Sequence, residues 1–410
     1  MELYTTPTPG PGAQTPMQAP NVGIVHDWFP GPGIAGGERV VQHMVGAFPN
    51  CEIYSLFDFL TEEQRQEVVG DRPINVSRLS HWPGVKKYYR YLLLQCTRAV
   101  EEFDVTHHDV VLTSSAALSK GVITAPGQPH LAYIHSPARY AWDLTHEYID
   151  SLQGTLGGLK RYMAHQTMHK FRLWDMRTPP SIDLMMANSK FIAQRIRKVY
   201  GRDAMVVYPP VDTDAFEMGT GVREDFYLAA SRMVPYKRID LIVEAFVGMP
   251  DKRLVVIGDG PDMARIKALA TPNVEVLGYQ RFDVLRNHMQ RARAFVFAAQ
   301  EDFGIMPLEA QACGTPVIAL GAGGTAETVK PLGQHPRPTG VWFRKQTVPE
   351  LQDAVSRLEA GLDQIDPVAC RDNAVFFGAA RFRDELREIV ERGNRIGYEA
   401  VLTEDLAKRT

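Results

Sequence analysis

Two glutamates eight residues apart, Glu301 and Glu309, enclose the segment DFGIMPL, whose residue types suit the binding of a phosphorylated sugar. Residues 306–313 predict a short helix with Pro307 in its first turn, where a missing N–H costs no hydrogen bond. Three backbone amides then lie free at the positive end of the helix, where they favour phosphate or hydroxyl oxygens. We expect Glu301 to hold sugar hydroxyls and Glu309 to bind a ribose diol; the alternative is two solvated charges beside a core helix. The three amides are those of Phe303, Gly304 and Ile305.

Two cations follow another candidate strand, residues 227–230. The segment SRMVPYKRID carries Arg232 and Lys237 toward the carboxyl end of that strand. A departing nucleoside diphosphate gains negative charge as its glycosidic bond breaks, and a guanidinium and an ammonium stabilise that charge. We therefore predict catalytic roles for Arg232 and Lys237, and we interpret the neighbouring Arg238 as a surface residue.

Paired glycines occur at two loop-to-helix junctions. Gly36 and Gly37 open a predicted helix over residues 38–48, directly after the first strand and a Pro/Gly loop. Gly323 and Gly324 precede a short helical segment in the same way. Residues without side chains let backbone amides approach a phosphate closely. We therefore predict that all four glycines bind the donor of the reaction, a phosphorylated sugar.

Two further patterns imitate other kinds of site. Gly258 begins a GDG segment after a strand, but Met263 occupies the place of the third glycine of a nicotinamide fingerprint, so a dinucleotide site is not predicted. We predict instead that Gly258 helps to bind the phosphorylated sugar donor. Asp212 and Asp214 have the D-x-D form that can hold a divalent metal through oxygen ligands. We interpret them as a turn and capping element, and we expect neither a metal nor a cofactor at the site.

The elements that position these residues are short apolar runs alternating with amphipathic stretches from residue 21 onward. Runs such as LVVIG and AFVFAA are apolar at consecutive positions, which indicates strands covered on both faces, as in a parallel sheet between helices. Open parallel sheets bind ligands at the carboxyl ends of their strands. The predicted fold class is α/β, with two Rossmann-like parallel-sheet domains facing each other across a cleft.

A segment rich in proline, glycine and polar residues divides the chain into two parts of ordinary domain size. We expect an acceptor domain before this linker and a nucleotide-sugar-binding domain after it, followed by C-terminal helices that cross back to the first domain. The expected divisions are a disordered tail at 1–20, the first domain at 21–210, the linker at 211–223, the second domain at 224–378 and the C-terminal helices at 379–410.

Composition excludes several classes of protein. The chain of 410 residues is 45% hydrophobic and 23% charged, values typical of a soluble globular protein. A net charge of −3 argues against a general nucleic-acid binder. The four cysteines form no C-x-x-C pair, which argues against a disulfide framework or a cysteine zinc site and favours a reducing compartment. No window of 18 apolar residues occurs, and residues 1–20 lack the pattern of a signal peptide, so we expect a cytoplasmic protein.

Several of these segments together resemble glycosyltransferase family 4, the retaining enzymes of GT-B fold. The segment EDFGIMPLE matches the family's Glu-x7-Glu box, and the likeness extends over most of the chain after residue 21. The segments HSPARYAWD and VPYKRID are similar to those of the bacterial subgroup that adds mannose in O-antigen or exopolysaccharide synthesis. The other matching segments are HDWFPGPGIAGGERV, NSKF, YPPVDTDAF, VVIGDGP and GAGGTAETV.

The resemblance implies a retaining hexosyltransferase that moves mannose from GDP-mannose to a polyprenyl-diphosphate-linked saccharide. It implies that Arg232 and Lys237 bind the donor diphosphate and that His135 lies against the donor sugar, so the expected catalytic set is these three with Glu301. It also implies front-face attack, in which the leaving phosphate takes the acceptor proton. The residues expected on the acceptor side are Arg139, Tyr140 and Asp143.

Other functions are compatible with the same architecture. A nucleotide-sugar epimerase would convert a sugar nucleotide without an acceptor, and a related glycosyltransferase would use a UDP-sugar. A dehydrogenase would need the missing third glycine. A non-catalytic scaffold would not need both cations and both glutamates, so their joint presence argues against it.

A basic and aromatic segment, residues 82–98, predicts a further partner. It carries four cations and several aromatic rings, with no acidic residue between positions 86 and 98. An amphipathic helix of this kind suits an anionic membrane surface at which a lipid-linked acceptor is presented, so we expect peripheral attachment to the inner face of the membrane. The alternative is a solvated basic helix whose tyrosines belong to the core. The four cations are Lys86, Lys87, Arg90 and Arg98.

Overall fold

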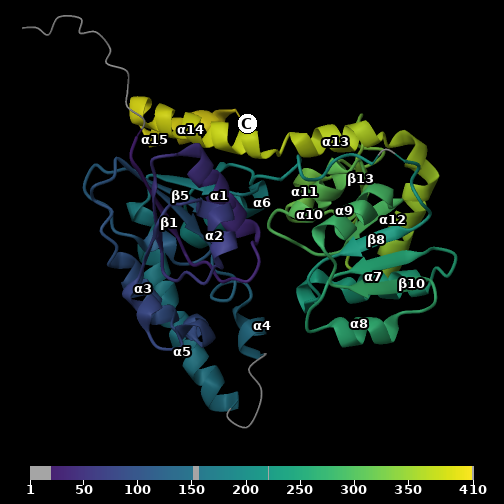
Figure 1. Ribbon diagram of the computed structural model, residues 1–410, viewed down its shortest axis with the longest axis horizontal. Helices are drawn as coiled ribbons and strands as arrows, with labels where there is room; N and C mark the ends of the chain where they lie inside the picture. Colours follow the sequence, from purple (N-terminus) through teal and green to yellow (C-terminus); the bar gives the residue numbers. More distant parts are fainter. Residues whose placement is uncertain (1–19, 151–156, 220, 409–410) are drawn as a thin grey trace, which may run out of the picture.

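The computed structural model describes residues 20–150, 157–219 and 221–408, and it contains two separate parallel sheets (Figure 1). All but the last residue of the expected tail at 1–20 lies outside the described residues, as does residue 220 of the linker. Both sheets have helices on their two faces, which confirms the predicted α/β class.

The first sheet has seven strands in the order β3-β2-β1-β4-β5-β6-β7, all parallel. Its central strands are fully buried, which explains why their sequences are continuously apolar. The strands are β1 (Val22–His26), β2 (Glu52–Ser55), β3 (Ile74–Val76), β4 (Val110–Ser115), β5 (His130–Ile134), β6 (Leu184–Ala187) and β7 (Met205–Val206).

The second sheet has six parallel strands in the order β10-β9-β8-β11-β12-β13. In each sheet the strand order reverses beside the first strand, β1 or β8, and this topological switch point is where open α/β sheets bind ligands. The strands are β8 (Tyr227–Ala230), β9 (Leu254–Ile257), β10 (Val274–Gly278), β11 (Ala294–Phe297), β12 (Val317–Leu320) and β13 (Gly340–Phe343).

The helices connect successive strands and cover the sheets. Helix α6 has a clear sequence signal at both ends: the Ser189 side chain accepts a bond from the Ile192 amide, and Gly201 ends the helix in a left-handed conformation. In the first domain the helices are α1 (Gly36–Ala47), α2 (Glu62–Val69), α3 (Leu93–Glu101), α4 (Thr145–Asp150), α5 (Gly157–Arg177) and α6 (Lys190–Tyr200). Those after β8 are α7 (Ile239–Val247), α8 (Met263–Leu269), α9 (Phe282–Arg291), α10 (Ile305–Ala312), α11 (Thr325–Thr328), α12 (Val348–Gly361), α13 (Pro367–Val375), α14 (Ala379–Ile396) and α15 (Tyr398–Ala407).

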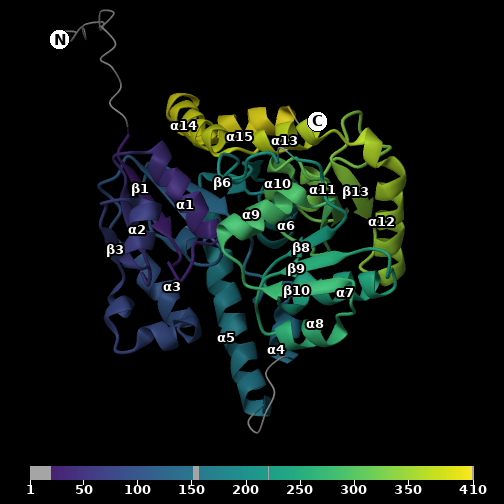
Figure 2. The ribbon, with the colours of Figure 1, turned by 45° about the vertical axis from the view of Figure 1, so that its right-hand side comes forward.

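The last two helices return to the first sheet, as Figures 1 and 2 show. The apolar face of α14 joins the core of the first domain through Phe382 and Leu386, which are fully or almost fully buried. On its polar face, Arg387 donates from Nε to the carbonyl of Ala47 at the end of α1, at 3.0 Å. The C-terminal segment therefore links the two domains on the side away from α5.

The basic and aromatic segment 82–98 is not one helix, so that prediction was wrong. Residues 85–91 form two short 3₁₀ turns, and α3 begins only at Leu93. Pro83 and Gly84 precede the turns, and Gly84 has a φ of 67°, a left-handed conformation that interrupts helical geometry.

Candidate functional site

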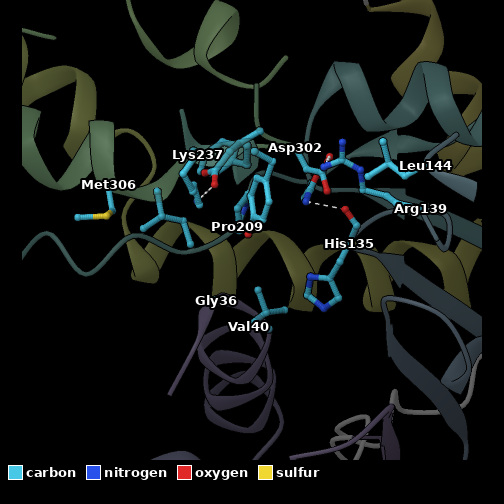
Figure 3. A pocket seen from close by; sticks show the side chains of 16 residues that line it. Gly36, Val40, His135, Arg139, Leu144, Pro209, Lys237, Asp302 and Met306 are labelled. Carbon is cyan, nitrogen blue, oxygen red and sulfur yellow. Dashed lines mark hydrogen bonds and ion pairs between the residues drawn. The ribbon is translucent and has the colours of Figure 1, made fainter. Parts of the chain in front are cut away.

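A cavity of about 600 Å³ lies between the two sheets, where the carboxyl ends of their strands face each other. Figure 3 shows α1 on one side of it and the residues after β8 and β11 on the other. Nine of the sixteen site residues predicted from the sequence line this cavity. They are Gly36, Gly37, His135, Arg139, Lys237, Glu301, Phe303, Gly304 and Ile305.

Helix α10 begins at the wall of the cavity. Gly304 precedes it with a φ of 86°, and a Cβ there would lie 3.2 Å from the Thr325 side chain, so both conformation and space favour glycine. Phe303 is buried and packs its ring against Tyr208 and Phe377. Among the described residues, no acceptor is paired with the amides of 303–305. The same three residues line the cavity, so these N–H groups lie at its wall.

The loop that carries Glu301 is held in place by Gly323 and Gly324. The Gly324 amide donates to the Glu301 carbonyl at 2.9 Å, so this amide is not free to bind a donor. A Cβ at Gly324 would lie 2.2 Å from the Cα of Phe303, and one at Gly323 would lie 2.4 Å from the Glu301 carbonyl. The glycine pair is explained by this close backbone packing, which shapes the cavity wall.

Lys237 and Glu301 form an ion pair inside the cavity. Lys237 ends a 3₁₀ turn, Pro235–Lys237, and the next residue, Arg238, has a φ of 54° that turns the chain into α7. Burial lowers the pKa of Lys237 to about 8, against the opposing effect of Asp302. The structure thus holds a desolvated ammonium whose present partner is a carboxylate that a bound anion can replace.

His135 follows β5 and faces the start of α1. Its Nε2 lies 2.8 Å from the Ser114 hydroxyl, and Asn188 donates to its backbone carbonyl at 2.9 Å. Burial, with a smaller effect of His26, lowers the pKa of His135 to about 4. A Cβ on Gly37 would lie 4.0 Å from the imidazole. His135 is therefore a neutral hydrogen-bonding group near neutral pH.

Seven predicted residues do not line the cavity. Arg232 is exposed in the loop after β8 and does not line the cavity, so of the two predicted catalytic cations only Lys237 reaches the cavity wall. Glu309, one turn into α10, is half-buried, and desolvation raises its pKa to about 7. Gly258 has a φ of 141° and packs against the Ser231 carbonyl, where a Cβ would lie at 1.8 Å. The others are Tyr140, Asp143, Gly323 and Gly324.

Two of the three predicted acceptor residues, Arg139 and Asp143, belong to a network of charged side chains. Arg139 lies 3.8 Å from both Asp143 and Asp302, and it is the one of the three acceptor candidates that lines the cavity. Arg195 contacts the same two carboxylates, at 2.5 and 3.2 Å. Because Asp302 belongs to the second domain, the network joins the two domains beside Glu301. Tyr140 packs against Phe171 instead.

Sequence reasoning missed Glu327, whose carboxylate accepts three hydrogen bonds across the domain boundary. Its carboxylate accepts bonds from the amides of Lys190 and Phe191, at 2.9 and 3.0 Å, at the start of α6. The Tyr208 hydroxyl donates to it at 3.0 Å. No local sequence pattern indicates this role of Glu327, because its partners are between 119 and 137 residues away in sequence.

The D-x-D sequence lies in a turn. Asp212 accepts a bond from the Ala215 amide at 3.2 Å, which is the capping role expected for it. Asp214 is exposed.

Two parallel α/β domains that face each other across a cavity at their strand ends define the GT-B class of protein. Family models match both halves: "Glycosyltransferase Family 4" over residues 34–215 and "Glycosyl transferases group 1" over residues 211–374. The chain belongs to glycosyltransferase family 4.

Curated relatives and solved structures agree with that assignment. A GDP-mannose-dependent alpha-(1-6)-phosphatidylinositol monomannoside mannosyltransferase of Mycobacterium tuberculosis is 30% identical over 55% of this chain and 65% of its own length. A GDP-mannose-dependent monoacylated alpha-(1-6)-phosphatidylinositol monomannoside mannosyltransferase of Corynebacterium glutamicum is 28% identical. That match covers 37% of this chain and 47% of the relative's length. The matches therefore span about half to two thirds of these relatives.

Among solved structures, Anabaena HepE in complex with UDP and glucose aligns with a TM-score of 0.63 at 16% identity. The alignment covers 91% of this chain and 99% of that one. Sucrose-phosphate synthase of Thermosynechococcus elongatus also aligns with a TM-score of 0.63 at 16% identity. This alignment covers 93% of this chain and 100% of that one. At this level of identity the likeness shows the fold.

Proposed function

We propose that this protein is a retaining glycosyltransferase that moves mannose from GDP-mannose to a lipid-linked saccharide in surface or exopolysaccharide synthesis. The observation that carries the proposal is the convergence of Lys237, Glu301 and the free amides before α10 on one cavity between the domains. The names of the mannosyltransferase relatives support the choice of donor.

The second domain binds the donor in this proposal. The diphosphate takes the place of Glu301 beside Lys237 and accepts bonds from the amides of 303–305, and the freed Glu301 carboxylate accepts bonds from sugar hydroxyls. Glu309 binds the ribose, and Arg232 moves toward the diphosphate as the domains close. No metal is required, because the lysine and the helix N-terminus carry the compensating charge.

The reaction in this proposal needs no dedicated side-chain base. The bond between the anomeric carbon and the β-phosphate oxygen breaks, and the acceptor hydroxyl oxygen bonds to the same face of that carbon. The hydroxyl proton passes to the departing phosphate, which leaves as part of GDP. Lys237 stabilises the charge that develops on GDP, and neutral His135 hydrogen-bonds the sugar. Closure of the domains excludes water that would hydrolyse the donor.

The first domain presents the acceptor in this proposal. Gly36, Gly37 and Arg139 are the residues through which the first domain would contact a saccharide, because all three line the cavity. The basic segment 82–98 lies in the same domain, with Tyr91 82% exposed and Trp82 44% exposed.

An anionic membrane is the surface that we propose for this segment. In the described part of the chain no carboxylate pairs with the four cations of the segment, so their charge is available to lipid headgroups. None of the described helices has the length and apolarity needed to span a bilayer. Peripheral attachment would bring the cavity close to a polyprenyl-diphosphate-linked acceptor.

A panel of nucleotide sugars, screened by thermal shift and then by calorimetry with and without EDTA, tests the donor. We expect GDP-mannose to raise the melting temperature more than UDP-glucose or UDP-galactose, and its affinity to persist in EDTA. A strict metal requirement would make Asp212 and Asp214 candidate ligands again. Conversion of the donor to an epimer without any acceptor would favour the epimerase alternative.

A further inference from the structure

A second cluster of polar side chains lies at the amino ends of β2 and β4, the edge of the first sheet opposite the cavity. Glu52 is the first residue of β2, and His107 and His108 come three and two residues before the start of β4. One ligand atom from each lies within 4.8 Å of the other two, and Glu52 Oε2 is 3.5 Å from His107 Nε2. His108 is only 4% exposed.

The position and tautomer of His108 are fixed by its neighbours. The Asn21 amide nitrogen donates to the His107 carbonyl, which leaves Asn21 Oδ1 to accept from His108 Nδ1 at 3.1 Å. The proton is therefore on Nδ1, and the lone pair of Nε2 points into the cluster. The ring lies over Gly23, where a Cβ would be 2.5 Å from it. A partner on the far nitrogen that fixes a histidine in this way is typical of metal ligands.

Tyr54 adds a fourth polar side chain to the cluster. The Tyr54 hydroxyl lies 3.1 Å from Glu52 Oε2 and 3.0 Å from His108 Nε2, but it has one proton to donate. His107 Nε2 lies 3.4 Å from the same hydroxyl and 3.5 Å from Glu52 Oε2, so ring nitrogens, a carboxylate and a hydroxyl converge at one point. A cation bound between the groups would satisfy both acceptors.

We propose that Glu52, His107 and His108 bind a divalent transition metal, with Zn²⁺ as the ion that this donor set suits best. Two imidazole nitrogens and one carboxylate oxygen form a common zinc ligand set, and a water molecule or the Tyr54 hydroxyl completes the coordination. The ion joins the amino ends of two strands that flank β1 and so stabilises the first domain. Because the site lies at the opposite edge of the sheet, its occupancy is independent of the proposed transfer reaction.

Calorimetric titration of Zn²⁺ into tag-free, EDTA-treated full-length protein tests the site. We expect one strong site per chain, abolished in His107→Ala and weakened about 10- to 100-fold in Asn21→Ala, which removes the bond to His108 Nδ1. The melting temperature of the wild type should rise with Zn²⁺, and that of His107→Ala should not.

A matched control is available on α5. His165 and His169 are exposed and one helical turn apart, an arrangement that can bind metal weakly by itself. The double variant His165→Ala/His169→Ala should retain the strong site. Absence of stoichiometric binding in the wild type, or strong binding that survives in folded His107→Ala, would overturn the proposal.

Discussion

Replacing Lys237 with alanine is expected to lower the rate of sugar transfer by about a hundred- to a thousandfold, the usual cost of one transition-state donor in a water-excluded site. The ammonium lines the cavity and pairs there with Glu301, so its loss removes a positive charge beside the proposed position of the departing diphosphate. Glu301→Ala should reduce transfer similarly by removing the sugar contact. Initial rates with GDP-mannose, with circular dichroism as the check on folding, measure both effects.

Arg238→Ala is the matched control for this prediction. Arg238 is the next residue in sequence and carries the same charge, but it contacts Asp240 at 3.3 Å and does not line the cavity. Its removal should change the rate less than threefold or so, in line with a surface position. Near-normal turnover of folded Lys237→Ala and Glu301→Ala would contradict the proposed site.

The same lysine predicts a pH dependence of donor affinity. Its pKa of about 8 means that the ammonium is present below pH 8 and is lost as pH rises. GDP affinity, measured by calorimetry from pH 6.5 to 9.5, should therefore fall above pH 8. Lys237→Arg should move this loss to higher pH, because a guanidinium keeps its charge. An affinity that is flat over this range would argue against contact between Lys237 and the diphosphate.

Replacing Glu327 with alanine is expected to lower kcat by about ten- to a hundredfold, the cost of misplacing groups that must meet across a cleft. The variant leaves two α6 amides and the Tyr208 hydroxyl without their carboxylate, so the domains lose a fixed relative orientation. GDP affinity should stay within about twofold, because Lys237 and the α10 amides both belong to the second domain. Steady-state kinetics and calorimetry separate the two effects.

Two further variants distinguish domain positioning from a general structural role. Glu327→Gln retains one side-chain oxygen and should recover part of kcat. Glu350 accepts a backbone bond from Arg344 at 3.1 Å within the second domain, so Glu350→Ala removes a similar interaction away from the cleft and should leave kcat unchanged. An unchanged kcat in Glu327→Ala, or equal losses of kcat and GDP affinity, would refute the positioning role.

The sheets were predictable because their central strands are buried on both faces and so are apolar at consecutive positions. The two strands that sequence reasoning missed, β3 and β13, lie at the outer edges of their sheets. β3 has only three residues, and none of them is fully buried. β13 begins directly after the loop segment PRPT, so the sequence before it has no strand pattern that would mark where the strand starts. β3 therefore carries little of the burial pattern on which the prediction rested, whereas three of the four residues of β13 are buried.

The cavity wall was predictable to the extent that its residues directly follow strands. His135 does so after β5, whereas Glu301 and Lys237 lie in loops, four residues after β11 and seven residues after β8. The difference between Lys237 and Arg232 was not predictable, because it depends on the turn at Pro235–Lys237 and on the left-handed Arg238. Glu327 and the histidine cluster were missed for another reason: their partners come from remote positions, which no local spacing reveals.

A crystal structure of the protein with GDP-mannose bound tests the central claim most directly. The account predicts the diphosphate within hydrogen-bond distance of Lys237 Nζ and of the amides before α10, with Glu301 turned toward the mannose hydroxyls. A nucleotide sugar bound outside the cavity between the two sheets, or with its diphosphate away from both Lys237 and α10, would contradict it.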